Sequence, residues 1–134
     1  MGLPEYRSEL APGWVSTPPA VLVIDDDEAL RHTVADFLAD AGFAPLLAEG
    51  GKAAIELLRR AEALPVAIVL DLHVPRVNGW AFRAQLAADP RMARIPVVVL
   101  TAERRAELTG PDVLLKPVDL DRLLEVLRAA TGRG

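Results

Sequence analysis

The chain has 134 residues, the size of one ordinary domain, and 51% of them are hydrophobic, which excludes a disordered chain. It has no cysteine, so a disulfide, a thiolate metal site and a cysteine nucleophile are excluded. The net charge is −4 without a basic run, and there is neither a signal peptide nor a membrane-length apolar run, so we expect a cytoplasmic protein that binds neither nucleic acid nor membrane.

The first 19 residues predict a flexible tail. They contain four prolines and show no apolar periodicity that would pack a helix or strand against a core. We therefore expect the folded domain to occupy residues 20–131.

Short apolar, β-branched runs predict five strands, over residues 21–24, 43–48, 66–70, 97–100 and 113–115. Apolar residues at helical spacing predict helices between them, over residues 30–41, 54–61, 80–88 and 120–131. The segment between the last two strands could hold barely two helical turns. Gly42 should end the first helix, and Asn78-Gly79 should form a turn before the third.

Strands that alternate with helices are typical of a doubly wound α/β fold with a parallel sheet. Pro45 cannot donate to a strand ladder, so the second strand should lie at an edge. This position agrees with the strand order 2-1-3-4-5 of flavodoxin-like folds, which we predict here.

Polar residues follow four of the five predicted strands, and in a parallel sheet all these ends meet at one edge. They are Asp25, Asp26, Asp71, Thr101 and Lys116. Carboxylates without thiol or imidazole partners suit Mg²⁺, and an Asp can also act as a nucleophile in phosphoryl transfer. Lysine is rare here, with two against thirteen arginines, so a lysine at a strand end is a selective choice.

Each of these residues also has an ordinary structural explanation. Helix capping would explain four of them, namely Asp25, Asp26, Asp71 and Thr101. Lys116 would then be a solvated strand end, and His73, two residues after the central Asp, an exposed loop residue. The complete set, in this order on these strands, favours a functional site over any of these explanations.

The sequence resembles the receiver domain of two-component response regulators (CheY-like). The resemblance rests on the sequences VLVIDDD, DLHVPRVNG, VVVLTA and LLKP at residues 21–27, 71–79, 97–102 and 114–117. The matching pieces are spread over nearly all of residues 20–131, and together they are highly specific.

The resemblance implies that Asp71 is the phosphoacceptor and that Mg²⁺ is the cofactor. Asp26 would bind the metal directly, Asp25 mostly through water, and His73 through its backbone carbonyl. Asp27 is an extra acid that we place outside the metal shell.

The remaining matches surround the phosphoryl group. The Thr101 hydroxyl would follow it, Lys116 matches the family's lysine, and Pro117 matches a proline usually joined by a cis bond. Ala102 matches a small residue that leaves the phosphoryl site accessible. The catalytic set implied is therefore Asp71, Thr101 and Lys116.

Two departures from the family fall on the face that most receivers use for output. The segment from Thr101 to Lys116 is shorter than usual by roughly two helical turns, so the fourth helix is truncated. Val113 stands where the family usually has a switch aromatic. No residue of the implied chemistry is lost.

The resemblance implies a single receiver domain, phosphorylated by a histidine kinase or a histidine phosphotransfer protein. We expect no output domain, signalling by contact with an unknown downstream protein, a monomer or weak dimer, and no enzymatic activity beyond its own phosphorylation and dephosphorylation. One alternative is an interaction module with a receiver fold that does not signal by phosphorylation. Another is a Mg²⁺-dependent phosphatase, although such enzymes commonly have a second Asp at the position of His73.

Overall fold

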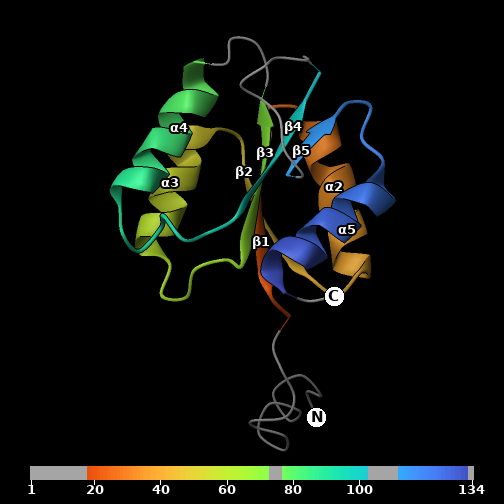
Figure 1. Cartoon of the computed structure of the whole chain (residues 1–134), viewed down its shortest axis with the longest axis horizontal. Helices are drawn as coiled ribbons and strands as arrows, with labels where there is room; N and C mark the ends of the chain where they lie inside the picture. The colour runs from red at the N-terminus through yellow and green to blue at the C-terminus, as the bar shows by residue number, and fades with distance from the viewer. Residues whose placement is uncertain (1–17, 73–76, 103–111, 133–134) are drawn as a thin grey trace, which may run out of the picture.

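The computed structural model describes residues 18–72, 77–102 and 112–132, and these fold around one parallel sheet (Figure 1). The five strands are β1 (Ala20–Ile24), β2 (Ala44–Ala48), β3 (Ala67–Leu72), β4 (Val97–Thr101) and β5 (Val113–Leu115). Their spatial order is β2-β1-β3-β4-β5, and every neighbouring pair is parallel. The predicted fold class and strand order are both confirmed.

Helices cover both faces of the sheet (Figure 1). They are α2 (Glu28–Asp40), α3 (Gly51–Arg60), α4 (Val77–Ala88) and α5 (Leu120–Thr131). The pair α3 and α4 lies on one face, and the pair α2 and α5 lies on the other. The chain is therefore doubly wound, as its alternation of strands and helices predicts.

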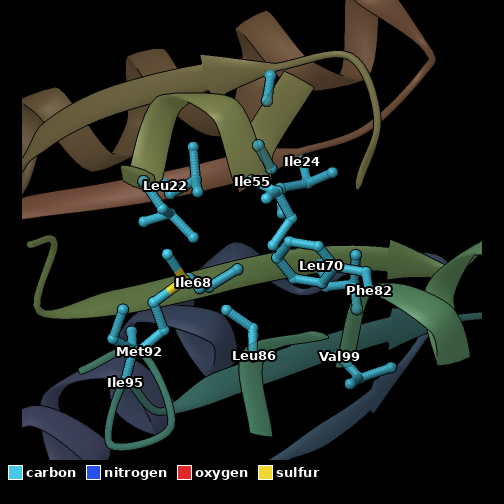
Figure 2. Packing of buried hydrophobic residues seen from close by; sticks show 13 residues of the cluster. Leu22, Ile24, Ile55, Ile68, Leu70, Phe82, Leu86, Met92, Ile95 and Val99 are labelled. Carbon is cyan, nitrogen blue, oxygen red and sulfur yellow. The ribbon is translucent and has the colours of Figure 1, made fainter. Parts of the chain in front are cut away.

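Each strand sends alternate side chains into the two halves of the core, because successive residues of a strand point to opposite faces. On β1, Leu22 and Ile24 pack with α3 and α4, whereas Val21 and Val23 pack with α2 and α5. Figure 2 shows the first of these two clusters, in which Phe82 of α4 lies among side chains of the sheet. Burial on both faces explains the continuous apolar runs of the central strands.

Two of the predicted punctuation residues lie where expected. Pro45 is in the edge strand β2, opposite Val21, where a missing N–H costs no ladder bond on the outer side. Gly42 follows the end of α2 with φ +99°, a left-handed conformation that glycine adopts without strain.

The predicted turn at Asn78-Gly79 is wrong, because α4 begins at Val77 and includes both residues. Asn and Gly form helices poorly, but they destabilise a helix less in its first turn, where the N–H groups have no partner within the helix. The strand before this helix is also longer than predicted: β3 continues through Asp71 to Leu72.

Three predictions concern residues outside the described part of the chain. They are the tail before residue 18, the backbone carbonyl of His73, and the short segment over residues 103–111. Among the helices that the structure does describe, none is long and apolar enough to cross a membrane.

Candidate functional site

The structure places the predicted residues at the carboxyl edge of the sheet. Asp25 directly follows β1, and Asp71 lies near the end of β3. Because Ile24 pairs with Leu70, these two aspartates are the next residues along neighbouring strands. They continue the alternation of Val23 and Val69, whose side chains lie toward α2 and α5. Both aspartates are buried, with 3% of Asp25 and 9% of Asp71 exposed.

Lys116 forms an ion pair with Asp71, and the distance from its Nζ to Asp71 Oδ2 is 2.6 Å. Their side chains are 19% and 1% exposed, respectively. The backbone N–H of Lys116 donates to the carbonyl of Thr101 at 2.8 Å, which ties the end of β5 to the end of β4. Lys116 is therefore held over the central carboxylate, and the explanation as a solvated strand end is wrong.

The position of Asp71 raises its pKa from the ordinary 3.8 to about 6. Burial is the main cause, because it penalises the charged form, and the neighbouring Asp25 adds to the effect. Lys116 acts in the opposite direction. The ionised form of Asp71, which is the form required of a nucleophile, still predominates at neutral pH.

Asp71 does not cap a helix, because it lies inside β3 and α4 begins only at Val77. The cap of α2 is Asp27, whose Oδ1 accepts from the N–H of Leu30 at 3.1 Å. The capping explanation for Asp25 and Asp26 is therefore also wrong, and Asp27 has a structural role as the cap of α2. Asp26 is exposed to solvent.

Asp25 is held by bonds to both its backbone and its side chain. Its N–H donates to the carbonyl of Ala48, and its Oδ1 accepts from the N–H of Asp27 at 2.9 Å. Its carbonyl accepts from Nη1 of Arg31 at 2.7 Å. Sequence reasoning did not single out Arg31, because an arginine in an amphipathic helix is ordinarily a solvated residue.

Thr101 is the last residue of β4 and is completely buried. It pairs with Leu72 of β3 and Leu115 of β5, so it lies within the sheet and the N-cap explanation is wrong. Thr101 lies at the same edge of the sheet as Asp71 and Lys116.

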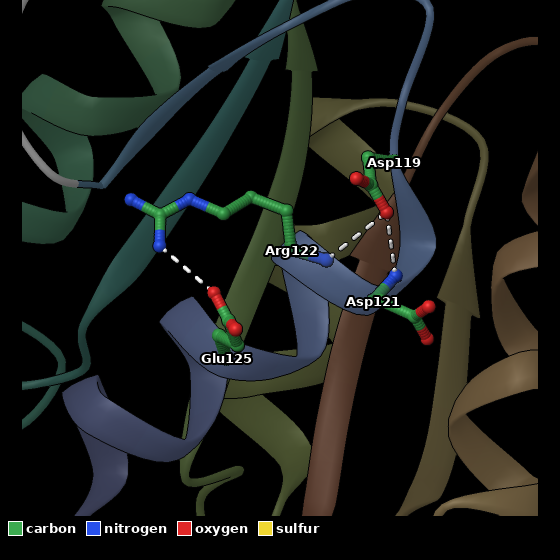
Figure 3. A network of polar contacts seen from close by, with 4 residues as sticks. All are labelled: Asp119, Asp121, Arg122 and Glu125. Atoms are coloured by element: carbon green, nitrogen blue, oxygen red, sulfur yellow. Dashed lines mark hydrogen bonds and ion pairs between the residues drawn. The ribbon is translucent and has the colours of Figure 1, made fainter.

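The loop that carries Lys116 leads into α5, whose first turn is capped by a side chain. The Lys116–Pro117 peptide bond is cis, as the resemblance implies. Beyond it, Asp119 caps α5 by accepting from the N–H groups of Asp121 and Arg122 (Figure 3). The cap stabilises the start of α5, which limits the freedom of the preceding loop.

The sequence profile of the response regulator receiver domain matches residues 21–128. The chain belongs to this family. The match runs from the second residue of β1 through β5 and most of α5, so the geometry above is that of a two-component receiver domain.

Similar proteins support the assignment. Response regulator Rre1 of Synechocystis sp. is 33% identical over 127 residues, which are 89% of this chain and 54% of Rre1. Response regulator MprA of Mycolicibacterium vanbaalenii is 37% identical over 123 residues, 87% of this chain and 52% of MprA. The receiver chain thus spans about half the length of these curated relatives.

Solved structures show the same fold. Chemotaxis protein CheY4 of Vibrio cholerae superposes with a TM-score of 0.74 at 26% identity, over 84% of this chain and 98% of CheY4. A putative response regulator from Chloroflexus aurantiacus superposes with a TM-score of 0.75 at 24% identity, over 87% of this chain and 99% of that one, which shows the fold alone.

The chemistry of this receiver site fits a hard divalent cation. Asp25 and Asp71 present buried carboxylates close enough for Asp25 to raise the pKa of Asp71, so a cation between them would relieve their repulsion. Within the described ranges, no three His, Asp or Glu side chains already form a metal-binding group. Mg²⁺ usually keeps several waters and binds one or two carboxylates, so water, the adjacent Asp26 or a ligand from outside those ranges would complete its shell.

Proposed function

We propose that Asp71 of this receiver domain accepts a phosphoryl group from a phosphohistidine of a histidine kinase or a histidine phosphotransfer protein. One observation carries the proposal. Asp71 is a buried carboxylate that lies against the Lys116 ammonium, 2.6 Å away, and beside the acidic Asp25. Receiver domains of response regulators act in two-component signalling, which is the context the proposal requires.

In the transfer step, an oxygen of Asp71 attacks the phosphorus atom. A P–O bond forms while the P–N bond of the phosphohistidine breaks, and the electron pair of that bond leaves with the imidazole. Asp71 becomes an aspartyl phosphate. Burial beside the apolar core keeps this carboxyl poorly hydrated, so few water hydrogen bonds must be broken before attack.

Lys116 and Thr101 would hold the transferred group. The carboxylate of Asp71 loses its charge when it becomes an acyl phosphate, so the Lys116 ammonium can turn to a phosphoryl oxygen. The Thr101 hydroxyl, at the end of the adjacent strand, can donate to another. Mg²⁺, held by Asp25, Asp26, Asp71 and the His73 carbonyl, would neutralise charge on the phosphoryl oxygens.

For the output of the domain, we propose contact with a downstream protein, by a monomer or a weak dimer in the cytoplasm. Nucleic acid is not among the partners we propose for the receiver domain itself. One relative, the DNA-binding dual master transcriptional regulator RpaA of Synechocystis sp., is 34% identical, and this chain covers 50% of it.

Incubation with acetyl phosphate and Mg²⁺, followed by intact-mass measurement, tests the function. We expect the wild type to gain the mass of one phosphoryl group, Asp71→Asn to show no gain, and Asp27→Asn to gain it as the wild type does, because the Asp27 side chain caps α2. Labelling of Asp71→Asn equal to that of the wild type would show that the acceptor is misassigned. Multiple-turnover phosphate release from a small phosphomonoester would instead identify a phosphatase.

A further inference from the structure

Arg31 lies in the first turns of α2, and its side chain turns back toward the loop that precedes this helix. Its Nη1 donates to the backbone carbonyl of Asp25 at 2.7 Å, a short bond assisted by the charge of the guanidinium. Arg31 is partly buried, whereas its neighbour His32 is exposed. A partly buried guanidinium committed to one carbonyl is unlike a solvated helix arginine, whose head group lies in water.

The acceptor of this bond matters for the direction of the next residue. The carbonyl of Asp25 and the N–H of Asp26 belong to one planar peptide unit, so holding the oxygen fixes the orientation of the whole unit. The N–H of Asp25, which belongs to the preceding peptide unit, donates to the carbonyl of Ala48. Arg31 thus completes a clamp that sets how the chain leaves β1 and where the Cα of Asp26 lies.

We propose that Arg31 is a positioning residue for the cation site, acting through the Asp25–Asp26 peptide. This inference rests on the proposed function, since it assumes that the two carboxylates bind Mg²⁺. The bonds from Asp25 to Ala48 and Asp27 orient Asp25 itself, and the bond from Arg31 orients the peptide that leads on to Asp26. The clamp supplies that orientation before the cation arrives, so less conformational freedom is lost on binding.

The competing explanation is purely electrostatic, and it predicts the opposite sign. A positive guanidinium near the site repels Mg²⁺, so its removal would tighten binding if orientation were unimportant. If orientation dominates, removal weakens binding. Partners that orient metal ligands typically affect metal affinity by about 10- to 100-fold when they are mutated.

The experiment is a titration of the unphosphorylated protein with MgCl₂ at constant ionic strength, followed by backbone amide NMR shifts, which also report folding. Arg31→Met keeps an unbranched apolar stem and removes the donor and the charge. We expect its Kd for Mg²⁺ to be about 10-fold higher than that of the wild type. The matched control is Arg128→Met, which removes an exposed arginine from the last turn of α5 and should leave the Kd within about twofold.

Arg31→Lys separates orientation from charge. Lysine keeps the charge, but its compact ammonium group is on a shorter side chain and lacks the planar fork of a guanidinium. We therefore expect a Kd for Mg²⁺ about threefold above that of the wild type. An unchanged or lower Kd in folded Arg31→Met would overturn the inference, and if that variant does not fold, an unchanged Kd in Arg31→Lys would do so. Failure of the wild type to bind Mg²⁺ would instead overturn the proposed function, which keeps the two failures distinct.

Discussion

Asp71→Asn should stabilise the protein in the absence of Mg²⁺, even though it destroys the proposed phosphoacceptor. Asparagine resembles the protonated carboxyl in size and has no charge. The charged form of Asp71 is the unfavourable one in the folded protein, because burial and Asp25 raise its pKa to about 6. The substitution removes this penalty, and Lys116, whose side chain is 19% exposed, can regain water.

The size of the effect follows from the pKa difference. A carboxyl with a pKa of 3.8 when unfolded and about 6 when folded favours the folded state most at low pH. That contribution is complete below pH 3.8 and is lost as the pH rises through about 6. The two pKa values differ by about 2.2. At high pH the ionised Asp71 therefore lowers the free energy of unfolding by about 3 kcal/mol, taking ~1.4 kcal/mol per pKa unit. We therefore expect Asp71→Asn to gain between about 1 and 3 kcal/mol at pH 8.

Urea unfolding in EDTA at several pH values measures this gain. The advantage of Asp71→Asn should fall by about 1 kcal/mol between pH 8 and pH 5, because Asp71 in the folded wild type becomes protonated over that range. Asp36→Asn, at an exposed position on α2, is the control and should change stability by less than about 0.5 kcal/mol. A variant no more stable than the wild type at pH 8, or a gain independent of pH, would refute the argument.

Three further predictions use simple measurements. Millimolar Mg²⁺ should raise the melting temperature of the wild type, because it binds the native state. Asp26→Ala should remove most of this increase, and an equal increase in Asp26→Ala would place the metal elsewhere. A chain that starts near Pro19 should keep a cooperative thermal melt, because the tail has no periodic apolar face, and loss of the melt would make the tail part of the core. Beryllofluoride should shift backbone NMR signals mainly in the loops after β3 and β4, because Val113, half-buried in β5, has no ring to bury; large changes across residues 103–115 with dimerisation would exclude this.

The frame of the domain was predictable because both faces of its sheet are buried. Continuous apolar runs are readily assigned as strands when helices alternate with them, and Pro45 placed one strand at the edge. The polar residues at the strand ends then had to lie close together, because parallel strands end at the same edge of a sheet. The clearest case is the pair formed by Lys116 and Asp71. These residues are 45 positions apart in the sequence, yet Lys116 Nζ lies 2.6 Å from Asp71 Oδ2.

Local signals failed where the tertiary fold outweighed them. Asn78-Gly79 is a strong turn signal, yet both residues lie in the first turn of α4, where the chain must return toward the sheet. Asp71 stopped the predicted strand, because aspartate is rare in strands, yet β3 continues through it to Leu72. Because β3 extends one residue beyond Asp71, the carboxylate lies inside the fold, where burial raises its pKa.

Arg31 shows what sequence patterns leave undetermined at a site of this kind. Its helical spacing and charge are those of any solvated arginine, and only the path of the chain between β1 and α2 brings it to the carbonyl of Asp25. A signal was present in the spacing, because a long side chain one turn into a helix can reach back over the cap to the strand end that precedes it. The residues that bear the chemistry follow from the order of the strands. The residues that orient these side chains are placed by loops that are too short to show a periodic pattern. Their roles therefore follow from the hydrogen bonds of the folded structure and not from the sequence pattern.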